Sequence, residues 1–189
     1  GGPMFDVGPY ILTALITMLG PVKRVAGSTK ISFPERYATA EGRNGEAFKV
    51  EVPTHITGTL DFEQGTIATI ITSFDMWGHN LPKIEIYGSE GTLSVPDPNQ
   101  FGGEVKIWKP DNREWKVVPI LETRGDTGRI IGVAEMAKAI IEERPHRAHS
   151  SQAYHVLDIM HAIHEASDNN QYIELKSTCE RPAALPEEL

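Results

Sequence analysis

The sequence predicts an α+β fold with one mostly antiparallel open sheet and helices packed on one of its faces. Three observations lead to this prediction. Residues 1–20 are apolar with helical spacing, residues 22–118 form a run of short alternating segments with tight turns, and two amphipathic segments follow. Consecutive strands joined by tight turns pair antiparallel, and helices grouped apart from them cover one face of the sheet. We expect residues 1–180 to form one domain and residues 181–189 a tail.

The first stretch, GGPMFDVGPYILTALITMLG, is predicted to be a helix from about Pro3 to Leu19. At 3.6 residues per turn one face is wholly apolar, and the flanking positions are largely apolar too. The opposite face carries a narrow polar stripe: Asp6, Tyr10, Thr13 and Thr17. A helix this apolar is normally buried, and an unpaired buried carboxylate is costly. A structural or a functional role must therefore account for the polar stripe.

Asp6 and Tyr10 are four residues apart, so their side chains are neighbours on the helix. In a structural interpretation, Tyr10 donates its hydroxyl to Asp6, or Asp6 lies in the first turn and complements the helix dipole. In a functional interpretation, the pair lines a cleft and handles a proton. Helix geometry alone favours the structural interpretation, because polar stripes are more often structural than catalytic.

The segments after the first helix read as strands and turns. Gly20 and Pro21 end the helix, and a strand is predicted from Val22 to Phe33. The polar segment from Pro34 to Lys49 lacks periodicity and is predicted to be a long loop. The clearest strand pattern follows, where residues 55–62 and 66–74 alternate around the turn Glu63-Gln64-Gly65. Further strands are predicted at residues 83–87, 92–95, 104–108, 114–118 and 172–175.

Two helices are predicted to close the domain. The first is expected to be capped by Asp126 or Thr127, to end at Pro145, and to turn an apolar stripe inward: Ile130, Val133, Ala134, Ala137, Ile140 and Ile141. The second is expected to be capped by Ser150 or Ser151, with these residues facing inward: Ala153, Val156, Leu157, Met160, Ile163 and His164. One sheet face should cover the first helix. The other sheet face is rich in Thr with scattered Ile, and it is either exposed to solvent or packs on the same face of a second copy of the chain.

The bulk composition describes an ordinary globular protein. The 189 residues are 40% hydrophobic and 23% charged, and the formal net charge is -8. This charge disfavours nucleic acid and anionic membrane surfaces as partners. The single cysteine, Cys179, excludes a disulfide framework and a cysteine-ligated metal site. With no signal peptide and no apolar run near the ~20 residues of a membrane span, we expect a cytoplasmic protein.

The segment GGPMFDVGPYILTALITMLGPVKRV resembles the start of the C-terminal domain in the glucose–fructose oxidoreductase / inositol dehydrogenase / MocA-like (Gfo/Idh/MocA) family. Members open this domain with Gly-Gly-x-x-x-Asp-x-Gly-x-His and an apolar helix. Asp6 and Gly8 match this pattern, and Tyr10 stands where most members have the catalytic histidine, although some branches place a tyrosine there. Residues 50–99 and 129–163 are also similar to family segments, so the resemblance covers nearly the whole chain.

The resemblance implies a division of labour between two halves of a longer protein. An N-terminal Rossmann domain would bind NAD or NADP through a Gly-rich loop and contribute a catalytic lysine from a Glu-Lys-Pro segment. This chain has neither motif, so we expect no cofactor binding and no hydride transfer from it alone. It would be the substrate-binding half of a dehydrogenase acting on a sugar, polyol or related CH–OH compound. The start at Gly1, without an initiator methionine, suggests a piece of that longer protein.

The resemblance also suggests roles for individual residues. Tyr10 would be the acid or base at the reacting hydroxyl, and Asp6 would orient or tune it. A tyrosine hydroxyl is a poor base at neutral pH unless a nearby cation stabilises its anion, and the family's lysine could be that cation. Side-chain chemistry, independently of the resemblance, suggests a second group, because a sugar needs hydrogen-bonding side chains and often an aromatic platform: Trp77, His79, Asn80, Arg36 and Arg124. The structural alternatives are an edge loop in which Trp77 packs, and surface ion pairs for Arg36 and Arg124.

Two other functions remain open on the sequence. The chain could be a non-catalytic sugar-binding or scaffold module that kept the fold, and Tyr10 in place of the commoner histidine favours that alternative. A metal-dependent hydrolase built on the last helix is the other, because His161 and His164 are three residues apart and could share a ligand. We expect no metal, and consider these histidines and His155 to be surface or half-buried residues.

Overall fold

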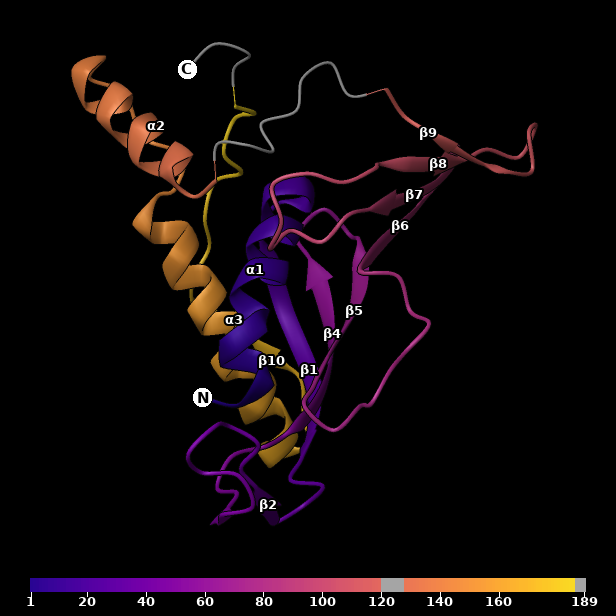
Figure 1. Cartoon of the computed structure of the whole chain (residues 1–189). Coiled ribbons are helices and arrows are strands. Elements are labelled where there is room, and N and C mark those ends of the chain that lie inside the picture. Colours follow the sequence, from indigo (N-terminus) through magenta and orange to yellow (C-terminus); the bar gives the residue numbers. More distant parts are fainter. Residues whose placement is uncertain (120–127, 186–189) are drawn as a thin grey trace. The chain divides into compact units, whose positions relative to one another are not determined.

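The computed structural model describes residues 1–119 and 128–185 (Figure 1). The chain divides into two compact units. Unit 1 comprises Gly1–Trp77 and His149–Pro182, and unit 2 comprises Gly78–Ala148 and Ala183–Leu189. The predicted α+β class with mostly antiparallel strands is confirmed, but the described strands form three sheets where one sheet was predicted. The single domain predicted for residues 1–180 stays a prediction.

Unit 1 is a four-stranded antiparallel sheet with two helices on one face. The sheet order is β10-β1-β4-β5, with bounds Ile173–Glu174 (β10), Val22–Lys30 (β1), His55–Phe62 (β4) and Ile67–Ser73 (β5). Helices α1 (Gly2–Leu19) and α3 (Ser150–Asn169) lie side by side along this sheet (Figure 1). The first helix and the central hairpin therefore form where the sequence predicts them.

Alternation along β4 decides which face of this sheet is the core. Its buried residues are Ile56, Gly58, Leu60 and Phe62, as predicted, and the residues between them are half-buried on the other face. Leu60 lies opposite Val25 of β1, which is also fully buried. Where β1 crosses α3, a Cβ on Gly27 would come within 2.6 Å of the Ile163 carbonyl oxygen, so only glycine allows this close approach.

The predicted long loop between Pro34 and Lys49 contains a small ribbon. Strands β2 (Glu35–Tyr37) and β3 (Ala47–Lys49) pair antiparallel within unit 1. The loop prediction is wrong at these six positions, because three-residue strands are too short to show an alternating pattern.

Unit 2 contains a second four-stranded antiparallel sheet and one helix. The strands pair in chain order, β6 (Ile84–Gly88), β7 (Gly91–Val95), β8 (Lys106–Trp108) and β9 (Trp115–Val117). The predicted hairpins are confirmed. The strands of the described residues thus form three sheets, because the irregular segment between β5 and β6 separates the first strands from the later ones.

Helix α2 (Ile130–Ile141) turns its apolar side outward. The stripe predicted to face inward includes Ile130, Val133, Ile140 and Ile141, which are 63–81% exposed. The buried residues of α2 are instead Glu135 and Ala139. The inward prediction is wrong, since helical periodicity shows which residues share a face but not which face is covered. The predicted caps, Asp126 and Thr127, lie outside the described residues.

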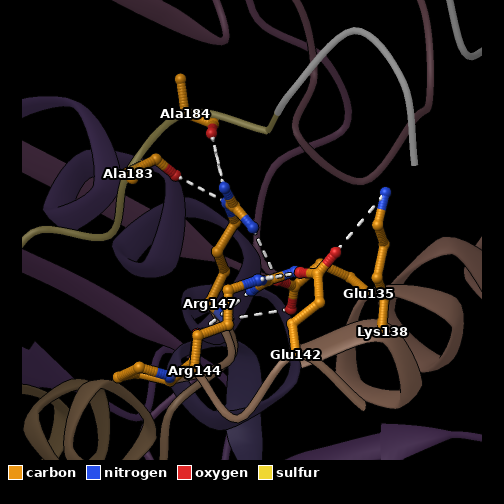
Figure 2. A network of polar contacts seen from close by, with 8 residues as sticks. Glu135, Lys138, Glu142, Arg144, Arg147, Ala183 and Ala184 are labelled. Atoms are coloured by element: carbon orange, nitrogen blue, oxygen red, sulfur yellow. Dashed lines mark hydrogen bonds and ion pairs between the residues drawn. The ribbon is translucent and has the colours of Figure 1, made fainter. Parts of the chain in front are cut away.

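The buried side of α2 is held by an ion-pair network (Figure 2). The Nη1 atoms of Arg144 and Arg147 each lie 2.6 Å from Oε1 of Glu135, and the Arg147 backbone N–H donates to Oε2 at 3.0 Å. Burial by itself would raise the pKa of Glu135, but the hydrogen bonds from the two arginines lower it to about 2. The Arg147 guanidinium also donates to the carbonyl oxygens of Ala183 and Ala184, which fixes the start of the tail.

Helix α3 differs from the prediction at its start and in its buried face. His149 is the N-cap, and its Nδ1 accepts from the Ser151 backbone N–H at 3.2 Å, where a serine cap was expected. Val156, Met160 and Ile163 are buried as predicted, whereas Ala153 and Leu157 are exposed. The buried residues of α3 are Gln152, His155, Val156, Ile159, Met160, Ala162, Ile163 and Ala166.

His155 is fully buried, contrary to the prediction of a surface or half-buried residue. Its Nε2 accepts from the Val22 N–H at 3.0 Å, so the neutral ring carries its proton on Nδ1, which donates to Ser177 Oγ at 2.8 Å. The Ser177 hydroxyl donates to Asp158 at 2.6 Å. Burial lowers the pKa of His155, which keeps the ring neutral. This chain of hydrogen bonds ties α3 to the start of β1.

Candidate functional site

The candidate site is on the exposed side of α1. Met4, Leu12 and Ile16 are fully buried on the other side, where α1 contacts the sheet and α3. Helix α1 is long and apolar enough to span a membrane, judged by length and composition alone. The core helix of a globular protein can have the same length and composition, and 33% of α1 is buried in this structure. Gly20, with φ 84°, ends the helix. The amphipathic pattern therefore gives α1 one packed side and one open side.

Asp6 and Tyr10 are both exposed and lie one turn apart on the open side of α1. Tyr10 is 37% exposed. Neither structural interpretation of the pair is realised: no hydrogen bond joins Tyr10 to Asp6, and the first turn of α1 holds no acidic residue. Among the residues that the structure describes, the Asp6 carboxylate has no hydrogen-bond or ion-pair partner. It is therefore available to a ligand.

Gly8, which shares the predicted motif with Asp6 and Tyr10, lies on the packed side of α1. A Cβ there would meet Met4 Sδ at 2.9 Å and Met160 Sδ at 3.4 Å. Both sulfurs lie near the ends of flexible side chains that can shift, so the contacts place Gly8 on the packed side without requiring glycine there. The motif thus combines one residue on the packed side with two residues on the open side.

The far end of the polar stripe has a structural role. Gln152 of α3 donates to the Thr17 hydroxyl at 3.1 Å, and that hydroxyl donates to the Thr13 carbonyl oxygen at 2.7 Å. Arg181 donates to the Thr17 carbonyl oxygen at 2.8 Å and so fixes the chain after β10. The stripe that the sequence shows as one feature divides into a structural end and an open end at Asp6 and Tyr10.

Two histidines of α3 hold the first turn of α1. The ring of Phe5 lies 5.0 Å from that of His161, edge to face, and 5.5 Å from that of His164, stacked. Burial lowers the pKa of His164. Within residues 1–119 and 128–185, no group of three or more His, Cys, Asp or Glu side chains could hold a metal ion. The hydrolase alternative therefore has no structural support in the described part of the chain.

The predicted sugar-contacting residues lie in the irregular segment after β5. Trp77 is fully exposed at the end of unit 1. His79 and Asn80 are exposed and belong to unit 2. All three are accessible to a ligand, and each is described only within its own unit.

Arg36 is engaged in an ion pair within unit 1. Its Nη2 donates to the Asp75 carboxylate, and Nη1 and Nη2 both lie 3.2 Å from the Phe74 carbonyl oxygen. Burial opposes the ionised form of Asp75, but hydrogen bonds that include one from Thr54, at 2.8 Å, hold its pKa below the ordinary value. Arg36 therefore forms an ion pair, which is the structural alternative given for it on the sequence. Arg124 lies outside the described residues.

A surface depression of about 340 Å³ lies where β1 begins and the β4–β5 hairpin turns. Charged residues of both signs line it: Lys23, Arg24, Asp61 and Glu63. None of the predicted site residues is among its lining residues. It is therefore a feature separate from the open side of α1.

The described residues do not fit a dinucleotide. Every strand pair is antiparallel, whereas the dinucleotide-binding βαβ unit requires parallel strands and a crossover helix. Cofactor chemistry is therefore not assigned to any residue of this chain.

Comparisons with known proteins agree with this architecture. The family model for the GFO/IDH/MocA C-terminal domain matches residues 1–94. Levoglucosan dehydrogenase in its apo form superposes with a TM-score of 0.75 at 19% identity, over 95% of this chain and 52% of that chain. An NAD binding oxidoreductase from Klebsiella pneumoniae gives 0.73 at 17% identity, over 93% and 51%. An oxidoreductase domain protein from Kribbella flavida gives 0.72 at 18% identity, over 94% and 52%.

Sequence identities this low show only that the folds are similar. The chain spans about half the length of these structures. Structures of levoglucosan dehydrogenase contain NADH with levoglucosan or with L-sorbose. No curated protein sequence matches the chain. Fold and family model together define a C-terminal domain of oxidoreductase type. The chain belongs to the GFO/IDH/MocA family.

Proposed function

We propose that this chain is the substrate-binding half of an NAD(P)-dependent oxidoreductase that acts on a sugar, polyol or related CH–OH compound by hydride transfer. The observation that carries the proposal is the open side of α1. An exposed carboxylate and an exposed phenol lie one turn apart on a helix whose other side is packed, and Asp6 has no partner among the described residues.

The proposed chemistry assigns only the proton to this chain. Oxidation of a secondary alcohol releases a hydride and a proton, and a nicotinamide held by the rest of the parent protein would supply the acceptor for the hydride. Tyr10 as the phenolate takes the hydroxyl proton and becomes the phenol, and as the phenol it gives the proton back in the reducing direction. Asp6 orients the Tyr10 hydroxyl or the substrate hydroxyl beside it.

The remaining contacts are proposed as substrate-binding groups. Trp77 offers an aromatic face, and His79 and Asn80 offer hydrogen-bonding groups, which are the kinds of side chain that suit a hydroxylated ring. Arg36 would contact the substrate through its guanidinium group while that group stays paired with Asp75. Arg124 is proposed on sequence grounds alone.

The test of the proposed function is an assay of the full-length protein that contains this chain. We expect NAD- or NADP-dependent oxidation of at least one compound in a panel of sugars, anhydrosugars and cyclitols, followed by absorbance of the reduced nicotinamide. Absence of turnover with every compound and both cofactors would contradict the proposal. Binding of a sugar without turnover would favour the alternative, a non-catalytic sugar-binding or scaffold module.

We also propose that the protein is a homo-oligomer through the open face of the unit 1 sheet. That face carries Thr57 and Thr59 from β4, which are half-buried, and Ile67 and Ile71 from β5, which are 70% and 42% exposed. A broad surface of threonines and isoleucines suits contact with a second copy of the same sheet, because isologous contact pairs like surfaces.

Replacing Ile71 by lysine is expected to weaken this assembly. A charge buried without a partner in an interface costs more than 1.4 kcal/mol, so the dissociation constant should rise at least ~10-fold. Light scattering across a concentration series measures the change. Val117→Lys, at an exposed position of β9, is the control. An unchanged mass for Ile71→Lys would place the interface elsewhere.

A further inference from the structure

The exposed side of α2 is a continuous apolar strip within unit 2. Side chains at helical spacing run along the 12-residue helix on the side away from Glu135 and Ala139. Its large members are Ile130, Val133, Met136, Ile140 and Ile141. At 1.5 Å per residue the helix is about 18 Å long, and half its circumference gives a strip on the order of 300 Å². Apolar patches of this size on a protein surface commonly mark interaction sites.

The rotation of α2 about its axis is fixed by its polar side. Glu135 receives hydrogen bonds from Arg144 and Arg147, and Arg147 also binds the tail at Ala183 and Ala184 (Figure 2). On the same helix, Lys138 lies 3.9 Å from Glu142. Turning the isoleucines inward would break the Glu135 network and leave its charges unpaired, which is unfavourable. The apolar strip is therefore held outward by the fold of unit 2.

The area of the strip argues against a second copy as its occupant. A stable interface between separate molecules buries about 800 Å² on each partner, several times this strip. A covalently attached domain needs far less contact, because its effective concentration near the strip is in the millimolar range. The solved structures that the chain resembles are about twice as long, and the chain covers 51–52% of each. Half of such a protein thus has no counterpart in this sequence.

We propose that the apolar side of α2 is the docking surface for the half of the longer protein that this chain lacks. This proposal rests on the proposed function, which assigns the cofactor to that half. The face expected to meet α2 is apolar, with a complementary strip of aliphatic or aromatic side chains. The Glu135 network then has a role beyond stability, since it presents the isoleucines to the other half.

The test places a photo-crosslinking residue, benzoylphenylalanine, at Ile140 in the full-length protein, kept dilute so that copies rarely meet. We expect a crosslink within one polypeptide to a peptide from the half outside this sequence. Asn112, exposed in the turn after β8, is the matched control position and should give no such crosslink. In a second measurement, Ile140→Cys should react with a maleimide about ten-fold more slowly than Asn112→Cys, because a docked surface reacts only after local opening.

A crosslink between two chains, a crosslink into residues 1–77 or 149–182, or equal labelling rates with no crosslink would each overturn the docking proposal. The same preparation is assayed for NAD(P)-dependent turnover. An active enzyme without the crosslink would contradict the docking surface alone. A crosslinked protein without turnover on any compound would contradict the proposed function and leave the docking surface standing.

Discussion

Replacing Tyr10 by phenylalanine is expected to lower kcat of the full-length enzyme by about 100-fold or more on the substrate found in the panel assay. General acid–base catalysis by a positioned side chain contributes typically 10²–10⁴-fold, and the phenol oxygen is the only atom removed. The proton moves in the transition state, so kcat should fall while KM changes little. Steady-state kinetics in both directions measure the two constants.

The control for this variant is Tyr154→Phe, which removes the same oxygen from a tyrosine of α3 that is 62% exposed. It should leave kcat unchanged. The melting temperature of Tyr10→Phe is measured beside kcat, because it separates a lost proton transfer from a damaged fold. Wild-type turnover in Tyr10→Phe would remove Tyr10 from the mechanism, and the non-catalytic alternative would then gain support.

The parts of the fold that local pattern controls were predictable from the sequence. The first helix follows from the spacing of its apolar residues and the Gly20-Pro21 stop, and the structure differs by one residue at its start. The β4 strand matches its predicted bounds, because alternation over eight residues is long enough to identify a strand and its buried face. The first helix contains the candidate site, so the placement of Asp6 and Tyr10 on one helix face was also predictable.

What the sequence could not show depends on partners distant along the chain. The apolar stripe of α2 was visible, but its direction depends on Glu135 meeting Arg144 and Arg147 nine and twelve residues later. His155 was missed as a core residue because its partners are the Val22 N–H, 133 residues away, and Ser177. A histidine followed by Val156 and Leu157 gives no local signal that it will be buried and hydrogen-bonded.

The candidate site shows the same division. Helical periodicity placed Asp6, Tyr10 and Thr17 on one face without distinguishing them. The contact of Thr17 with Gln152 of α3 shows that this threonine has a structural role. Arg36 was identified as a substrate-binding candidate from its charge, and the structure supplies Asp75 as a partner 39 residues later. Local pattern thus identifies the face, while long-range contacts decide which of its residues have structural partners.

The second large effect is expected for Glu135→Gln, which should destabilise unit 2 by about 2 kcal/mol at neutral pH. A pKa of about 2 against an ordinary 4.5 corresponds to about 3 kcal/mol of stabilisation of the ionised form. Arg144 and Arg147 remain 30% and 25% exposed, so water screens part of that interaction. The amide keeps the shape of the side chain, but it carries no charge and its NH₂ group faces guanidinium donors.

The pH dependence gives this prediction its sign. Because the folded pKa of Glu135 is lowered, its stabilisation is fully present above pH 4.5 and is lost as the pH falls from 4.5 toward 2. The stability difference between wild type and Glu135→Gln should therefore be largest at neutral pH and shrink through that window. Urea unfolding at several pH values measures it, with the fluorescence of Trp108 and Trp115, whose rings lie 5.9 Å apart in the unit 2 sheet, as the probe.

Glu142→Gln is the matched control, because it removes the same charge from a carboxylate that is 42% exposed beside Arg144. Exposed ion pairs contribute little, so this variant should lie within about 0.5 kcal/mol of the wild type at every pH. If both variants were equally destabilised, the net charge of α2 would matter rather than the buried carboxylate. A Glu135→Gln difference that stayed constant down to pH 2 would mean that Glu135 does not carry the lowered pKa, and that α2 keeps its orientation by other contacts.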